Sequence, residues 1–109
     1  MANSYKVLAQ SYPNAITNTD IYTVGAGKSA VISTIVVANL TGTQLTFRVA
    51  IRQGGASLSN QHYIAYDSKI SGNDTAFITV GPTLAAGDVI TVYVGTQGIS
   101  FNVFGTEIS

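Results

Sequence analysis

The chain contains no cysteine and very little charge, and each shortage excludes a class of protein. Without cysteine, neither a disulfide framework nor a thiolate metal site can form. Its five basic and five acidic residues leave no net charge, and the charged fraction of 9% lies far below the roughly 25% typical of soluble domains. A basic patch for nucleic acid is missing, so we expect no nucleic acid partner. The scarcity of charge instead favours assembly, with part of the surface covered by neighbouring protein.

Signals for membrane insertion and secretion are also missing. The apolar segment Ala30–Leu40, AVISTIVVANL, is too short to cross a bilayer as a helix, so we expect no membrane partner. Residues 1–15 have neither the basic start nor the long apolar run of a signal peptide. The sequence therefore does not indicate one cellular compartment over another.

The same segment, Ala30–Leu40, is the centre around which we expect the fold to form. Its many β-branched residues favour a strand over a buried helix. Its apolar residues alternate onto both sides, which is typical of a strand covered from both sides. They are Ala30, Ile32, Val36 and Ala38 on one side, and Val31, Ile35 and Val37 on the other.

Residues 44–52 show the clearest alternation of apolar and polar residues in the chain. One side carries Leu45, Phe47, Val49 and Ile51, and the other carries Thr46, Arg48, Ala50 and Arg52. We expect the first set in the core and the second outside it.

Short β-prone segments separated by turn residues make up most of the remaining chain, and none has a helical period. We expect further strands at 16–24, 62–67, 75–80, 89–94 and from 99 to near the end of the chain. The predicted fold class is all-β, an antiparallel β-sandwich of about eight strands, and a jelly roll is the arrangement that we expect. Residues 15–109 form one sandwich domain in this prediction, and residues 1–14 form either an N-terminal arm or an edge strand.

One segment partly matches a phosphate-binding loop. Residues 25–29, GAGKS, end in Gly-Lys-Ser, but the first glycine of the motif would fall at Tyr22. The motif also needs a helix after the loop, whereas Ser29 opens the most strand-like stretch. We therefore expect no nucleotide and no other cofactor.

Catalytic residues are equally hard to find. His62 is the only histidine, and no cysteine or suitable serine spacing accompanies it. The acidic residues lie mostly at turns, where capping explains them, and Asp88 beside Gly87 has such a structural role available. A metal site would need several ligands. We expect no catalytic and no metal-ligating residues, since a small enzyme would need a convergent polar cluster around His62.

Arginine and tyrosine are the candidate interface residues. Arg48 and Arg52 lie on the non-core side of one strand, where they serve either a protein interface or a solvated face. Tyr63 and Tyr66 are expected on opposite faces of their short strand, and an exposed tyrosine suits a protein interface or a carbohydrate-stacking platform. The full set of candidates is Tyr5, Tyr12, Arg48, Arg52, Tyr63 and Tyr66.

Five segments, which cover most of the chain in order, resemble a group of small structural proteins of tailed bacteriophages. They are YTVGAGKSAVIS at 22–33, RVAIRQGGA at 48–56, HYIAYDSKISGNDT at 62–75, LAAGDVITVYV at 84–94 and SFNVFGTEIS at 100–109.

The resemblance implies a virion component without enzymatic activity. It implies a capsid decoration (cement) protein on the head surface, with a structural or host-binding module of the tail, baseplate or fibre as the alternative. The implied partners are the major capsid protein or other virion proteins. A homo-oligomer is expected, and a trimer would follow the local symmetry of a capsid lattice.

Overall fold

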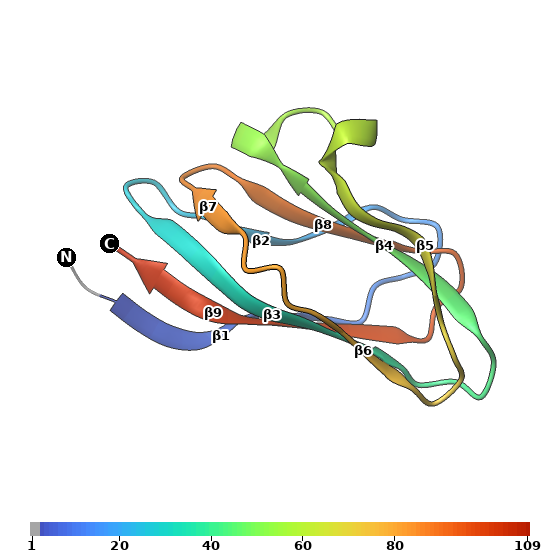
Figure 1. The fold of residues 1–109 in the computed structure, drawn as a ribbon. Coiled ribbons are helices and arrows are strands. Elements are labelled where there is room, and N and C mark those ends of the chain that lie inside the picture. The colour runs from blue at the N-terminus through green and yellow to red at the C-terminus, as the bar shows by residue number, and fades with distance from the viewer. Residues whose placement is uncertain (1–2) are drawn as a thin grey trace.

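The computed structural model describes residues 3–109, and nine strands in this range form two antiparallel sheets (Figure 1). The first sheet has five strands in the order β1-β9-β3-β6, with β7 also paired to β3, and the second has four in the order β2-β8-β4-β5. The bounds are β1 Asn3–Ser11, β2 Thr19–Thr23, β3 Ser29–Asn39, β4 Leu45–Arg52, β5 Tyr63–Ile70, β6 Thr75–Ile78, β7 Thr83–Ala85, β8 Val89–Val94 and β9 Ile99–Ile108. The predicted all-β antiparallel sandwich is confirmed.

The strands pair as a nested series along the chain. The nested pairs are β1 with β9, β2 with β8, β3 with β6 and β7, and β4 with β5; β3 also pairs with β9 and β4 with β8, and every pair is antiparallel. The two ends of the described chain therefore lie side by side, as the blue β1 and the red β9 show in Figure 1.

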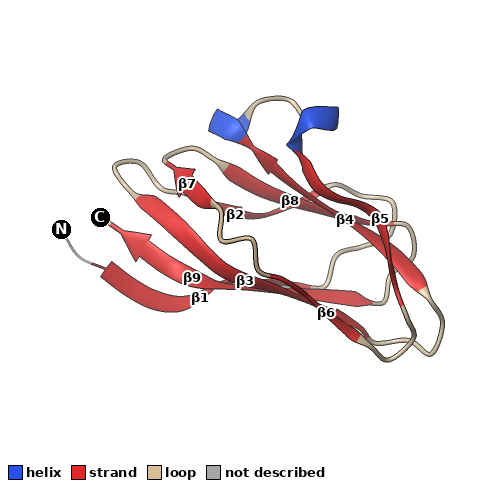
Figure 2. Ribbon diagram, viewed as in Figure 1, coloured by secondary structure: helices blue, strands red, loops and turns tan. Residues whose placement is uncertain are grey.

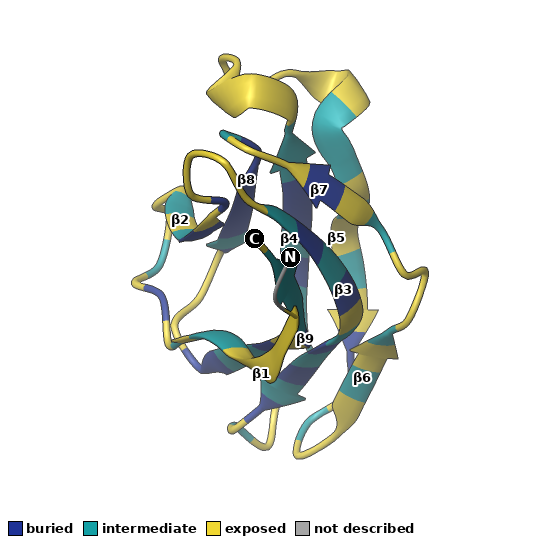
Figure 3. Ribbon diagram, turned by 90° about the vertical axis from the view of Figure 1, so that its left-hand side faces the viewer, coloured by how far each residue is buried: buried dark blue, intermediate teal, exposed yellow. Residues whose placement is uncertain are grey.

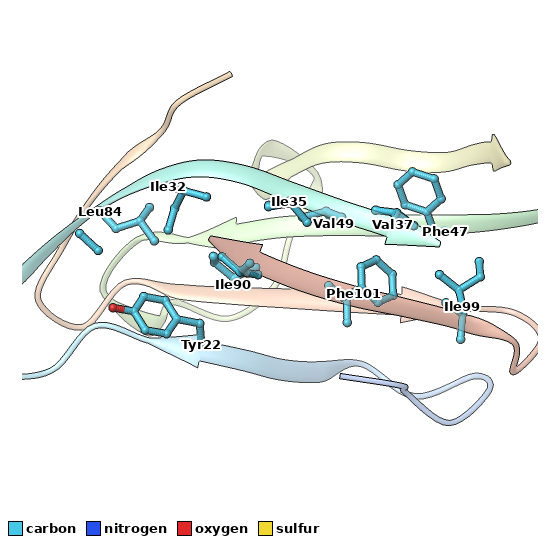
Figure 4. Close-up of a cluster of buried hydrophobic side chains, with 14 of the residues drawn as sticks. Tyr22, Ile32, Ile35, Val37, Phe47, Val49, Leu84, Ile90, Ile99 and Phe101 are labelled. Atoms are coloured by element: carbon cyan, nitrogen blue, oxygen red, sulfur yellow. The ribbon is translucent and has the colours of Figure 1, made fainter. Parts of the chain in front are cut away.

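The core lies between the two sheets and receives one face of each (Figure 4). Phe101 from β9 and Phe47 from β4 meet edge to face across it, with ring centroids 6.1 Å apart. Of the expected inward set on β4, Phe47 and Val49 are buried and Ile51 packs against the core. Burial of these side chains is the main stabilising term of the fold.

Strand β3 is central in the first sheet, as predicted, but its two faces are not equally covered. Ala30 and Ile32 are buried, and beyond an irregularity in the pairing with β9 between Ile32 and Thr34 the buried residues become Ile35 and Val37. A β-bulge inserts an extra residue and so moves the inward positions from even to odd numbers. The prediction of a strand covered on both sides is wrong, because the outer face is only half-buried.

The N-terminal segment is an edge strand of the first sheet. Strand β1 pairs with β9 from Asn3 to Ser11, and Leu8 and Ala9 pack against the core. Strand β7 lies outside the segments that we expected as strands; its Leu84 is buried beside β3.

Two single-turn 3₁₀ helices, η1 (Gln53–Gly55) and η2 (Asn60–His62), connect β4 to β5 (Figure 2). Asp88 anchors η1, because its two carboxylate oxygens accept the backbone N–H of Gly54 at 2.8 Å and of Ala85 at 2.9 Å. The structural role expected for Asp88 is confirmed.

Candidate functional site

The outer face of the second sheet carries a connected group of charged and aromatic side chains, which we call the arginine face. It comprises Asp20, Arg48, Arg52, Tyr63, Tyr66, Asp67, Thr91 and Tyr93, from strands β2, β4, β5 and β8. The alternation on β4 places both arginines here, opposite the core-facing Phe47 and Val49, as predicted.

Arg48 is held on this face by three neighbours. Its Nε donates to Asp67 Oδ1 at 2.7 Å, and its guanidinium lies between the rings of Tyr66 and Tyr93, at 4.2 and 4.5 Å from their centroids. The hydrogen bond between them lowers the pKa of Asp67 and raises the pKa of Arg48. Cation–π contacts with two rings and the pair with Asp67 engage the guanidinium within the chain, and 24% of the Arg48 side chain stays exposed.

The Arg52 guanidinium forms more hydrogen bonds than that of Arg48. Its guanidinium donates to Thr91 Oγ1 at 3.0 Å, to Asp20 Oδ2 at 2.9 Å, and to the carbonyl oxygens of Gly55 and Ala56. Thr91 Oγ1 in turn donates to Asp20 Oδ1 at 2.7 Å. Only 16% of the Arg52 side chain is exposed. Its role in the structure is to fasten β2, β8 and the loop after η1 to β4.

Tyr63 and Tyr66 lie on the same face, so the expectation of opposite faces is wrong. Their rings meet edge to face with centroids 4.8 Å apart. The pairing of β4 with β5 is irregular around Ile64, so that Tyr63 opposes Ala50 while Ala65 opposes Val49. The extra residue turns Tyr66 to the side of Tyr63. Asp67 then takes a left-handed conformation with φ of 49°, which is uncommon for a residue other than glycine.

The two tyrosines and Asn60 of η2 line a shallow surface hollow of about 470 Å³. Tyr66 is 55% exposed and Tyr63 is half-buried, so the rings are accessible from this hollow. The combination of two aromatic rings and an amide makes the hollow the best-formed candidate for a small-ligand site on this face.

The outer face of the first sheet differs sharply, and we call it the uncharged face. Its outward positions follow from the strand register, and none of those in the strand pairs carries a charge. The exposed apolar side chains on it are Tyr5 and Val7 from β1, Phe104 from β9 and Phe77 from β6. Exposed residues of β1 and β6, the two edge strands of this sheet, are coloured yellow on the ribbon of Figure 3. Tyr5 is thus one of four exposed apolar residues on this face, where uncharged polar residues such as Thr34, Asn102 and Thr106 lie between them.

Tyr12 follows β1 and borders a second hollow, of about 330 Å³, together with residues 10–11 of β1 and 100–102 of β9. It is half exposed and makes no hydrogen bond to the described residues. The hollow adjoins the uncharged face, where Gln10 Nε2 donates to Asn102 Oδ1 at 2.8 Å.

One further polar cluster lies at the end of the sandwich near the chain termini. Tyr22 donates its hydroxyl hydrogen to Glu107 Oε2 at 2.7 Å, and Lys6 Nζ lies 2.7 Å from Glu107 Oε1. Burial, followed by the hydrogen bond to Glu107, raises the pKa of Tyr22. Hydrogen bonds from Lys6 and Tyr22 lower the pKa of Glu107. The cluster ties β1 and β2 to β9.

His62 caps η2, with its Nδ1 accepting the backbone N–H of Ser59 at 3.0 Å. Within residues 3–109, no three His, Asp or Glu side chains are grouped so that they could hold a metal ion. The same range contains no helix with the length and apolar character needed to cross a membrane.

Sequence reasoning identified both arginines and both tyrosines but missed Asn60, Tyr93 and Phe77. Tyr93 and Phe77 each stand in a strand that was expected, where alternation alone could have placed them outside the core. Asn60 lies between the expected strands at 44–52 and 62–67, where no local pattern indicates which way an amide side chain faces. Neither family models, curated proteins nor solved structures include a match to the chain, so its own surfaces must carry the functional interpretation.

Proposed function

We propose that this chain is a non-enzymatic structural protein of a tailed bacteriophage virion, and that it decorates the outer surface of the head by binding the major capsid protein as a homo-oligomer. The observation that carries the proposal is the uncharged face. Exposed aromatic and aliphatic residues lie there without a single charged residue among the paired positions.

The size of the uncharged face supports a docking role. Four adjacent strands about 4.8 Å apart, with the longest of 11 residues, present a surface of about 600 Å². A standard protein interface buries about 800 Å² per partner, so this face would supply most, but not all, of one partner's share. Because no charge has to lose its water, docking here avoids the largest desolvation cost.

The resemblance of five segments to small structural proteins of tailed phages supports the virion assignment. A capsid offers many copies of one surface, so modest affinity at each site is multiplied in an oligomer that contacts several. We propose a trimer, with the exposed edge of β1 as the element that meets a neighbouring copy.

The strand order also agrees with the predicted jelly roll, and we propose that arrangement for the sandwich. A jelly roll is an antiparallel ribbon rolled into two sheets. The nested pairs β1·β9, β2·β8, β3·β6 and β4·β5, which alternate between the two sheets, correspond to such a ribbon, with β7 as an addition.

A second candidate is a tail, baseplate or fibre module that binds the host. The hollow formed by Asn60, Tyr63 and Tyr66 favours it, since paired tyrosines beside an amide are suited to recognition of a small polar ligand.

Quantitative mass spectrometry of purified phage particles tests both candidates. A ratio to the major capsid protein near one, or at a simple fraction of the lattice, supports the decoration role. A few copies per particle would contradict decoration and support the tail or fibre role. Complete absence from particles would overturn the virion assignment.

A further inference from the structure

The hollow beside β5 contains polar side-chain groups that form no hydrogen bonds within residues 3–109. The Asn60 amide and the hydroxyls of Tyr63 and Tyr66 make no hydrogen bond to any residue in the range 3–109. An amide both donates and accepts, and so does a phenol hydroxyl, so all three residues can bind a ligand that carries hydroxyl groups.

The aromatic part of the hollow is held in place before any ligand arrives. The Arg48 guanidinium stacks on the Tyr66 ring at 4.2 Å, and the Tyr63 ring packs against Tyr66 at 83°. The backbone of Asn60 is fixed at the start of η2, where its carbonyl oxygen accepts the backbone N–H of Tyr63, and its side-chain amide is free to turn toward a ligand. Groups already held in one geometry lose little conformational freedom on binding, which favours affinity for a small ligand.

The backbone of β5 is irregular where it places Tyr63 and Tyr66 on one face. The pairing of β4 with β5 is irregular at two places, and Asp67 has a φ of 49°. Bulges near binding sites redirect side chains, and here they bring Tyr63 and Tyr66 together on one face. A regular strand would separate these two residues, so the aromatic pair depends on the irregular backbone.

Charge at the hollow is balanced within the protein. The Arg48 guanidinium donates to both carboxylate oxygens of Asp67, at 2.7 and 3.3 Å, so neither charge is left to attract an ion. The ligand that fits is therefore neutral, with an apolar side to lie against an aromatic ring and hydroxyl groups at its rim.

We propose that the hollow lined by Asn60, Tyr63 and Tyr66 is a binding site for a neutral sugar ring, such as a hexopyranose at the end of a glycan. The site does not depend on the virion assignment, because its geometry is the same wherever the protein resides. The Tyr66 ring provides the apolar contact, and the Asn60 amide and the two phenol hydroxyls bond the sugar hydroxyls.

Titration of the ¹⁵N-labelled full-length protein with the methyl glycosides of glucose, mannose, galactose and N-acetylglucosamine tests the proposal by NMR. At least one should cause saturable shifts confined to η2 and β5, with a dissociation constant in the millimolar range that is typical of a single shallow contact. Absence of saturable shifts from all four at up to about 50 mM would overturn the proposal. Saturable shifts on the uncharged face instead would overturn it as well.

Variants separate stacking from hydrogen bonding. Tyr66→Ala should weaken sugar binding by about tenfold or more, and Tyr66→Phe, which keeps the ring on Arg48, by only a few-fold. Phe77→Ala removes an exposed ring from the uncharged face and should leave binding unchanged. If Tyr66→Ala perturbs the fold, Asn60→Ala replaces it, since this amide has no structural bond to lose. Unchanged binding in both Tyr66→Phe and Asn60→Ala, or tighter binding of glucuronate or glucosamine than of glucose, would contradict the site as described.

Discussion

The two outer faces of the sandwich differ in how their side chains are used. On the arginine face, each arginine is paired with an aspartate from another strand, and Arg48 is covered by two rings as well. On the uncharged face, large apolar side chains are left open to solvent, with Tyr5 exposed by 81% and Phe77 by 67%. The charges of the arginine face are satisfied inside the chain, whereas large apolar side chains of the uncharged face remain open to solvent.

This contrast separates stability from assembly. Removing a group that is already bonded inside the chain lowers the free energy of unfolding. Removing an exposed apolar group hardly changes that free energy, but it can abolish contact with another protein. We therefore expect substitutions on the arginine face to act on folding and those on the uncharged face to act on association.

The largest loss of stability is expected for Arg52→Met, which keeps the aliphatic stem and removes every hydrogen bond of the guanidinium. Asp20, Thr91 and two loop carbonyls lose a partner, so the free energy of unfolding should fall by about 2–3 kcal/mol in urea denaturation. Gln10→Met is the matched control, because it removes one exposed hydrogen bond from the uncharged face and should cost less than about 0.5 kcal/mol. Equal losses in the two variants would remove the distinction between the faces.

A smaller loss is expected for Arg48→Met. Two cation–π contacts and one exposed ion pair disappear, and together they account for about 1–2 kcal/mol. Lys69→Met is the control, since this lysine on β5 has no ion pair within the described range, and its stability should stay close to wild type. A loss for Arg48→Met that vanished at high salt would assign the whole effect to the ion pair and none to the rings.

Lowering the pH should show how much the cluster of Lys6, Tyr22 and Glu107 contributes to stability. This cluster lies at the end of the sandwich and belongs to neither outer face. The pKa of Glu107 is lower in the folded protein than its ordinary value of 4.5, so its contribution to stability is complete above pH 4.5 and is lost as the pH falls through the folded pKa. In urea denaturation between about pH 3 and 7, Glu107→Gln should lose less stability on acidification than the wild type. Identical slopes for Glu107→Gln and the wild type would contradict the assignment.

Local alternation was enough to predict which side of β4 faces the core. The apolar residues Phe47 and Val49 and the charged Arg48 and Arg52 alternate without interruption, and a strand has no other way to place them. The all-β class followed in the same way, from short β-prone segments between turns. Both depend on residues that are close in sequence.

The predictions that failed concern features set by residues that are far apart in the sequence. The bulges near Thr34 and Ile64 are set by the register with strands elsewhere in the chain, and each moves the following residues to the other face. Arg52 meets Asp20 across 32 residues, so its partner could not be read from its neighbours. The arginines were correctly placed on the outside, but their engagement within the chain becomes visible only once four strands are aligned.

The smallest change in stability, and the sharpest test of the comparison, is expected for Phe77→Asp. The side chain lies on an edge strand of the uncharged face and is mostly exposed, so the free energy of unfolding should change by no more than about 0.5 kcal/mol. A buried carboxylate without a partner would cost several kcal/mol in an interface, so sedimentation assays should show loss of binding to phage particles that lack the protein. Ile64→Asp introduces the same charge at an exposed apolar residue on β5, the edge of the other sheet, and should leave particle binding intact. If Ile64→Asp abolished binding and Phe77→Asp did not, the proposed docking surface would move to the second sheet, and the apolar residues of the first would be ordinary exposed side chains.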